Sequence, residues 1–200
     1  MKRVICTGLA VLDHVFYVPE IPKKPTKSFA TSYQILGGGN AATAAVAISR
    51  AGGQAVFWGS LGDDLNGDII LSELEEFGVD VKHVNRLNGL NSPVSSVLVD
   101  NTGERLITNF TNHKLIKKAD WLPLGKLGEY DAILADLRWQ EGAIKALRKA
   151  HELGIPGVLD ADLAPEGLNE EVIKNATHVL FSEPALNEFA TGKSTIEALH

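Results

Sequence analysis

The sequence predicts an α/β fold in three layers, with a mostly parallel central sheet between helical layers and a smaller β-sheet projecting from it. Short apolar runs alternate with helical segments over most of the chain, which is typical of a parallel sheet covered on both faces. Two other segments, about 12–36 and 94–111, contain strand-like runs with no helix between them. They lie too far apart to form one hairpin, so we expect them to pair into a small second sheet.

The N-terminal part of the chain supplies the first of these β-rich segments. Residues 3–10 (RVICTGLA) form a short apolar run rich in β-branched residues and predict a buried first strand. Residues 15–18 and 29–36 predict two further strands, separated by the turn-rich, basic stretch PEIPKKPTKS. A strand followed by a hairpin does not begin an ordinary βαβ unit, so a β-rich insertion interrupts the alternation here.

The remaining elements follow in regular order along the chain. Glycines directly after the first two helical segments are typical of helix ends, and Asn101-Thr102-Gly103 is a hairpin turn signal between VSSVLVD and ERLITNF. Helices are expected over 41–51, 66–77, 142–153, 168–175 and 183–190, and central strands over 55–59, 131–136, 157–160 and 177–181.

Composition excludes several classes of partner. The formal net charge is −6 and the pI is about 5.5, and with no basic face in the sequence we expect neither nucleic acid nor an anionic membrane as partner. Cys6 is the only cysteine, so an internal disulfide is impossible, which fits a reducing compartment. No apolar stretch approaches the roughly 18 residues of a membrane span. We expect a cytoplasmic protein.

The stretch GGGNAATAAVAI, residues 37–48, places three glycines directly before an alanine-rich helix. It formally satisfies the dinucleotide fingerprint G-x-G-x-x-A, with Asp63 about twenty residues further on. The context is wrong, because the fingerprint belongs directly after the first strand. The alternatives are that the glycines only let the helix approach a sheet closely, or that their backbone N–H groups face a small polar ligand.

The same stretch, continued as GGGNAATAAVAISRAGG and followed by VFWGSLGDDLNGD, resembles the ribokinase-like, or phosphofructokinase-B, family of carbohydrate kinases. The pieces GLAVLD, FGVDV and VDNTGERLITNF agree with it. The resemblance runs through essentially the whole chain and corresponds to the N-terminal two thirds of these kinases. It implies a ribokinase-like fold with a β lid over a sugar, transfer of the ATP γ-phosphate to a sugar hydroxyl, and ATP and Mg²⁺ as cofactors.

A closer resemblance, carried by AATAAVA, LADLRW, VLDAD and FSEPAL, is to the sulfofructose kinases within that family. It implies that Lys27, Asn109 and Arg138 surround a sulfonate, and an ammonium, an amide and a guanidinium suit such a permanently charged group. Each has a simpler interpretation: a solvated lysine, a strand-end turn residue and a surface ion pair.

The family resemblance also implies residues that contact the sugar and the phosphates. Asp13 would accept hydrogen bonds from sugar hydroxyls, unless it only stabilises a turn, and the Gly38-Gly39 backbone and Asn40 would approach the sugar closely. In the family many members carry Asn-x-x-Glu near the last strand, whereas this chain has Glu183 and Leu186, so the metal ligands stay open. The residues expected near the phosphates and Mg²⁺ are Asp160, Asp162 and Glu183. Asp63 and Asp64 precede a helix, and one of them is expected to cap it.

These kinases carry their catalytic aspartate in a Gly-Ala-Gly-Asp motif late in the chain, and the 200 residues contain no such motif. We therefore expect a truncated chain whose catalytic base lies beyond His200 and which is inactive alone. The alternatives are a non-catalytic sugar-binding relative and an NAD-dependent dehydrogenase. The exposed lid predicts a homodimer, because an uncovered sheet seeks a partner.

Overall fold

The computed structural model describes residues 1–164, 167–193 and 196–197, and its largest sheet has the predicted parallel arrangement. The strand order is β11-β10-β9-β1-β4, and every neighbouring pair is parallel. The α/β prediction is thus confirmed. The five strands are β1 (Arg3–Thr7), β4 (Gln54–Trp58), β9 (Ala132–Asp136), β10 (Gly157–Ala161) and β11 (His178–Phe181).

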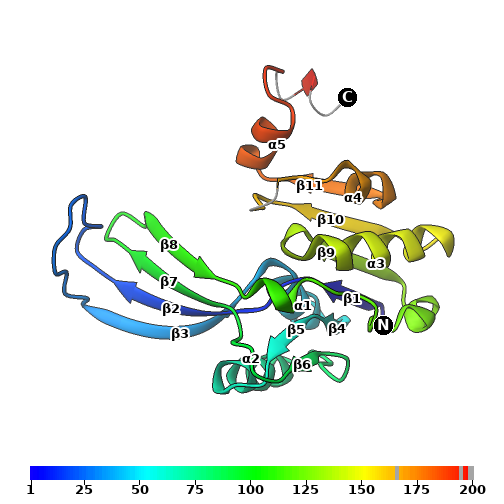
Figure 1. The fold of residues 1–200 in the computed structure, drawn as a ribbon, viewed down its shortest axis with the longest axis horizontal. Coiled ribbons are helices and arrows are strands. Elements are labelled where there is room, and N and C mark those ends of the chain that lie inside the picture. The colour runs from blue at the N-terminus through cyan, green and yellow to red at the C-terminus, as the bar shows by residue number, and fades with distance from the viewer. Residues whose placement is uncertain (165–166, 194–195, 198–200) are drawn as a thin grey trace.

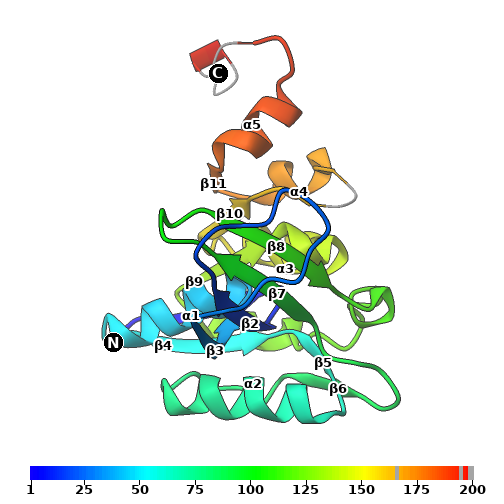
Figure 2. The same cartoon turned by 90° about the vertical axis from the view of Figure 1, so that its left-hand side faces the viewer.

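Helices cover both faces of this sheet. Successive residues of a strand point to opposite sides, so a strand that is apolar throughout has two faces to bury. Ile5 belongs to the hydrophobic cluster that includes Ala143, Ala146 and Leu147 of α3, whereas Cys6 belongs to the cluster that includes Ala41 and Ala45 of α1. Figures 1 and 2 show these helices on the two sides of the sheet. The helices are α1 (Asn40–Arg50), α2 (Leu65–Glu76), α3 (Gln140–Glu152), α4 (Glu170–Asn175) and α5 (Glu183–Phe189).

A second, four-stranded sheet projects from the large one (Figure 1). It joins two antiparallel pairs, β3 (Ser32–Gly38) with β2 (Val11–Tyr17), and β7 (Val94–Val99) with β8 (Arg105–Phe110). The parallel pairing of β2 with β7 connects them. The predicted pairing of two segments far apart in sequence is therefore confirmed. We call this four-stranded sheet the small sheet.

The predicted first strand is too long. β1 ends at Thr7, because Gly8 has a φ of +154° and turns the chain, and β2 begins only at Val11. Asp13 therefore lies within the second strand. A two-stranded sheet of β5 (Ser60–Gly62) and β6 (Asn85–Leu87) was not predicted from the sequence.

Three short 3₁₀ helices complete the described elements: η1 (His113–Leu115), η2 (Leu124–Glu129) and η3 (Leu137–Trp139). The first follows the small sheet and the last follows β9, so that both lie at the carboxyl side of their strands. Within the described ranges, no helix combines the length and apolar character that crossing a bilayer requires.

Candidate functional site

A row of polar side chains crosses the small sheet on one face. Asp13 of β2 pairs with Ser95 of β7, which in turn pairs with Asn109 of β8. Asn109 Nδ2 donates a hydrogen bond to Ser95 Oγ at 3.0 Å. Burial raises the pKa of Asp13, although the hydrogen bond from Ser95 and the charge of His14 act in the opposite direction. Two predicted substrate residues, Asp13 and Asn109, thus belong to one polar row.

The glycine loop that joins the small sheet to α1 is shaped by atoms of the protein itself. A Cβ on Gly38 would lie 2.2 Å from Asp13 Oδ2, and one on Gly39 would lie 2.4 Å from the carbonyl oxygen of Leu9. Gly39 also has a φ of +92°, which favours glycine. Contacts within the protein therefore explain why Gly38 and Gly39 carry no side chain, and a sugar contact with their backbone stays a prediction. The loop follows β3 of the small sheet, so the strand context of a dinucleotide fingerprint is absent.

Asn40 is the first residue of α1 and connects that helix to the central sheet. Its Nδ2 donates to Asp160 Oδ2 on β10 at 2.9 Å. Burial raises the pKa of Asp160, the hydrogen bond from Asn40 lowers it, and the charge of Asp162 raises it. The structure therefore brings a predicted sugar residue and a predicted phosphate residue into direct contact.

A hollow of about 750 Å³ lies between the end of β8, the segment around η1, and the start of α3. Asn109 and Arg138 both line it. Arg138 is half-buried, and its guanidinium makes no hydrogen bond or ion pair with any residue in the described part of the chain. A guanidinium without an anionic partner that faces a hollow can bind an anion there.

The lining also includes two groups that the sequence analysis missed, Lys117 and His113. No motif singles them out, since they follow β8 in a segment without regular periodicity. Lys27, by contrast, is exposed in the connection between β2 and β3 and does not line this hollow. Of the three residues expected around a sulfonate, the structure brings together Asn109 and Arg138, and the role of Lys27 stays a prediction.

Asp136 is a further residue that the sequence analysis did not single out. It ends β9, is 1% exposed, and accepts backbone hydrogen bonds from Leu9, Ala41 and Arg138. Burial raises the pKa of Asp136 to about 6, although these three hydrogen bonds act in the opposite direction. Its position at the carboxyl end of a buried parallel strand, where open α/β sheets bind ligands, was the available signal.

The carboxylates predicted near the phosphates lie at the ends of β10 and β11. Asp162 directly follows β10 and accepts a hydrogen bond from Ser182 Oγ at 2.8 Å, while Glu183 is exposed as the first residue of α5. Among the described residues no group of three or more His, Cys, Asp or Glu side chains could hold a metal. The donors fit an Mg²⁺ ion only in the common arrangement with one or two carboxylates, nucleotide phosphates and water.

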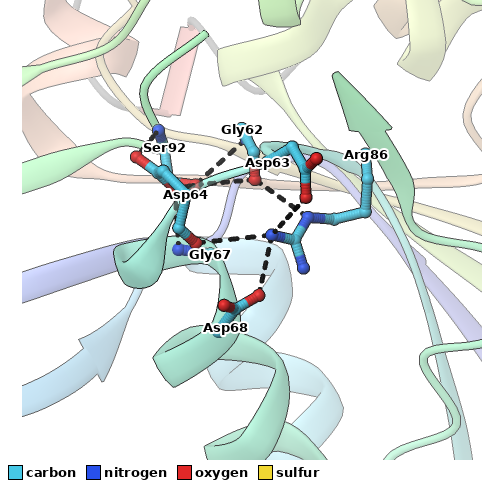
Figure 3. Close-up of polar contacts among 7 residues, drawn as sticks. All are labelled: Gly62, Asp63, Asp64, Gly67, Asp68, Arg86 and Ser92. Carbon is cyan, nitrogen blue, oxygen red and sulfur yellow. Dashed lines mark hydrogen bonds and ion pairs between the residues drawn. The ribbon is translucent and has the colours of Figure 1, made fainter. Parts of the chain in front are cut away.

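The two neighbouring acidic residues Asp63 and Asp64 belong to a structural network (Figure 3). Asp64 caps α2 as expected, accepting from the backbone N–H of Gly67 and from both the N–H and the hydroxyl of Ser92. Burial would raise the pKa of Asp64, but these bonds and the charge of Arg86 together lower it. Arg86 contacts the carbonyl oxygen of Gly62 at 2.8 Å and the Asp63 carboxylate at 3.4 Å. The network holds the chain that leads into β7.

Comparison with known proteins identifies the family and the fold. Residues 1–199 match the family described as pfkB family carbohydrate kinase. The ribokinase of Bacillus subtilis (strain 168) is 26% identical over 185 residues, which cover 92% of this chain and 63% of that enzyme. The chain thus spans less than two thirds of this relative.

Two solved structures have the same fold. A candidate ribokinase from Agrobacterium tumefaciens superimposes with a TM-score of 0.91 at 38% identity, covering 99% of this chain and 65% of that one. The ribokinase of Arabidopsis thaliana, complexed with ribose and ATP, superimposes with a TM-score of 0.77 at 18% identity, covering 99% and 66%. With its parallel sheet, projecting small sheet and family match, the chain belongs to the pfkB family of carbohydrate kinases.

Proposed function

We propose that this chain forms the sugar-binding part of an ATP-dependent kinase that phosphorylates a hydroxyl group of a ketose. We further propose that the ketose carries an anionic group, with sulfofructose as the candidate substrate. The observation that carries the second proposal is the half-buried guanidinium of Arg138, which lines the hollow without an anionic partner in the described part of the chain.

The residues around the hollow support binding of an anion. Arg138 and Lys117 are cationic. Asn109 Nδ2 donates one of its two hydrogens to Ser95, so the other is left to donate to a ligand. Glu141 is the only carboxylate among the described lining residues; it pairs with Lys145 at 2.9 Å, and this lysine also pairs with Asp120 at 2.6 Å. In a chain of net charge −6, this hollow therefore favours an anionic sugar over a neutral one. Lys27 would join it only if the exposed connection between β2 and β3 moved toward the ligand.

The sugar hydroxyls would be held by Asp13, by Asn40 and by the backbone of Gly38 and Gly39. Asp13 has acceptor capacity beyond its bond with Ser95. The side chain of Asn40 is oriented by Asp160, which leaves its carbonyl oxygen as an acceptor.

ATP and Mg²⁺ are the proposed cofactors, supported by the fold shared with the ATP-bound Arabidopsis thaliana ribokinase. The carboxylates that would lie nearest the phosphates are Asp160 and Asp162, with Glu183 beside them. Bound Mg²⁺ would neutralise charge on the transferring phosphoryl group. The 200 residues contain no Gly-Ala-Gly-Asp motif and none of them is proposed as the general base, so these residues alone are expected to bind sugar without turning it over.

A homodimer through the small sheet is also proposed. Its face opposite Asp13 carries Tyr33, Ile35 and Leu106, which are 44–48% exposed. Apolar side chains gathered on an exposed sheet mark an interaction surface. Replacing Ile35 and Leu106 by Asp is expected to convert a dimer to a monomer in size-exclusion chromatography with light scattering. The control is Leu153→Asp, at an apolar position of similar exposure beyond α3, and a wild-type monomer contradicts the proposal.

The kinase proposal is tested with protein expressed from the complete reading frame. ATP-dependent turnover of sulfofructose, fructose 6-phosphate and fructose is measured for the wild type, Arg138→Ala and Arg138→Lys. We expect sulfofructose to be preferred, and Arg138→Ala to raise its KM by about 10–100-fold, the loss of one charge-assisted pair of bonds. Arg138→Lys is expected to restore only part of this loss, because an ammonium lacks the fork. Binding without turnover would favour the non-catalytic relative, and equal KM values in all variants would contradict the anionic substrate.

A further inference from the structure

Asp136 is the only charged side chain in the described part of the chain that is fully buried. Its carboxylate accepts three backbone hydrogen bonds. Oδ2 accepts from Leu9 at 2.9 Å and from Ala41 at 3.1 Å, and Oδ1 accepts from Arg138 at 2.9 Å. A carboxylate is an acceptor with about four lone-pair sites, so it can serve three donors at once.

The three donors belong to three separate segments, and each segment contributes to the candidate site. Leu9 lies in the turn between β1 and β2 and lines the hollow. Ala41 directly follows Asn40 at the start of α1, and Arg138 lies in η3. Among the described residues, the Asp136 carboxyl group is the acceptor that these three N–H groups share. One buried side chain thus connects the turn at Leu9, the start of α1 after the glycine loop, and the segment that carries Arg138.

We propose that Asp136 is a positioning residue, which fixes the separation between the glycine loop and Arg138 and thereby sets the affinity for an anionic sugar. This inference rests on the proposed function, since it takes Arg138 as the anion-binding group. Asp136 itself does not line the hollow, so it acts through the groups that it holds.

Three features stabilise the Asp136 carboxylate against the cost of its burial. The N–H of Ala41 belongs to the first turn of an 11-residue helix, where the backbone dipole favours a negative charge. Hydrogen bonds to an ionised acceptor are shorter and stronger than neutral ones. The turn is also shaped around the carboxyl group, since a Cβ on Gly8 would lie 2.2 Å from Asp136 Cγ. The isosteric amide of asparagine would have to present an NH₂ group to at least one of the three donors, leaving a buried N–H unpaired.

The test is a double-mutant cycle in protein expressed from the complete reading frame. Sulfofructose binding is measured by isothermal titration calorimetry at pH 7.5 for the wild type, Asp136→Asn, Arg138→Ala and the double variant. We expect Asp136→Asn to weaken binding by about 10–100-fold in the wild-type background, and by less than about 3-fold once Arg138 is already Ala. This overlap is the readout that a purely structural role would not produce, because independent effects add.

The matched control is Asp131→Asn. Asp131 directly precedes the same strand, is exposed, and also accepts a backbone N–H, from Arg3 at 2.8 Å. Its substitution is expected to leave sulfofructose affinity unchanged. Equal losses from Asp136→Asn in both Arg138 backgrounds, or no loss at all, would overturn the positioning role. If the wild type neither binds nor phosphorylates any of the sugars, the proposed function fails as well.

A measurement on the wild type covers the case in which Asp136→Asn does not fold. Hydrogen exchange at the amides of Leu9, Ala41 and Arg138 is followed with and without sulfofructose. Since all three share one acceptor group, their protection is expected to rise together on binding. Protection that rises at only one of them would contradict the proposal.

Discussion

Alanine substitutions at the two neighbouring glycines of the loop are expected to differ: Gly38→Ala should mainly weaken sugar binding, and Gly39→Ala should mainly destabilise the fold. At Gly38 the three heavy atoms nearest to an added Cβ all belong to the carboxyl group of Asp13, the nearest being Oδ2 at 2.2 Å, and Gly38 has no positive φ, so the backbone there is compatible with alanine. Asp13 can rotate away, so the free energy of unfolding should fall by only about 1 kcal/mol. The displaced carboxylate can no longer bind the sugar, and the loss of about 1.5–3 kcal/mol for a charged hydrogen bond corresponds to roughly 10–150-fold in affinity.

At Gly39 the same methyl group meets backbone. The nearest atom is the carbonyl oxygen of Leu9 at 2.4 Å, and the φ of +92° is unfavourable for alanine. The left-handed conformation costs about 1–2 kcal/mol, and overpacking adds about 1–3 kcal/mol. Gly39→Ala should therefore lower the free energy of unfolding by about 2–5 kcal/mol. Gly52→Ala separates the two contributions, since Gly52 has a φ of +85° with nothing within 4 Å.

The assay combines urea denaturation, which reports the free energy of unfolding, with calorimetric titration of the sugar. The reasoning is refuted if Gly38→Ala binds sugar as tightly as the wild type, or if it destabilises the protein as much as Gly39→Ala. It is also refuted if Gly39→Ala and Gly52→Ala have equal stabilities, because the contact with Leu9 would then contribute nothing.

Three further predictions concern stability. Asp64→Ala removes the cap of α2 and the bonds to Ser92 and should lower the free energy of unfolding by about 1–3 kcal/mol; a loss below about 0.5 kcal/mol in urea melts would contradict the network. Leu147→Ala, at a fully buried position, should cost about 2–5 kcal/mol, whereas Leu153→Ala, at an exposed one, should cost far less. The third is a pH dependence. The raised pKa of Asp136, about 6 against 3.8, means that the folded protein binds its proton more tightly, so stability from this group is present below pH 4 and is lost as the pH rises through 6. On going from pH 8 to pH 4, the free energy of unfolding of the wild type should rise by up to about 3 kcal/mol relative to that of Asp136→Asn. The other titratable groups that face Asp136, Cys6 on β1 and Asp160 on β10, are present in both proteins. Parallel curves of stability against pH for the two proteins would contradict the linkage.

The fold was largely predictable because its strands and helices have strong local patterns. The pairing of β2 with β7 could be anticipated from the absence of helices within two distant segments. The end of β1 could not, because the apolar run continues through Leu9 and Ala10 while Gly8 already turns the chain. Residues 9–12 are buried in the turn and in β2 and are therefore apolar, so in the sequence they look like a continuation of the first strand.

The candidate site was only partly predictable, for a physical reason. Asn40 could be placed from the sequence, because it stands between the glycines and the alanine-rich run at the start of α1. Asp13 was identified from its motif, although it lies within β2. Lys117 reaches the hollow through an irregular segment whose path depends on packing against distant elements. Asp136 acts through backbone N–H groups, which every residue carries, so no side-chain pattern reveals its partners.

The parallel pairing of β2 with β7 has a consequence for synthesis on the ribosome. The hairpin of β2 and β3 is complete at residue 38, but its second edge finds a partner only when Val94–Val99 has emerged. At about 5–20 residues per second this delay is roughly 3–12 s, during which Val15, nearly inaccessible in the finished molecule, borders an unpaired β edge. Nascent chains stalled between residues 40 and 90 should therefore associate with one another or recruit chaperones more than longer ones do.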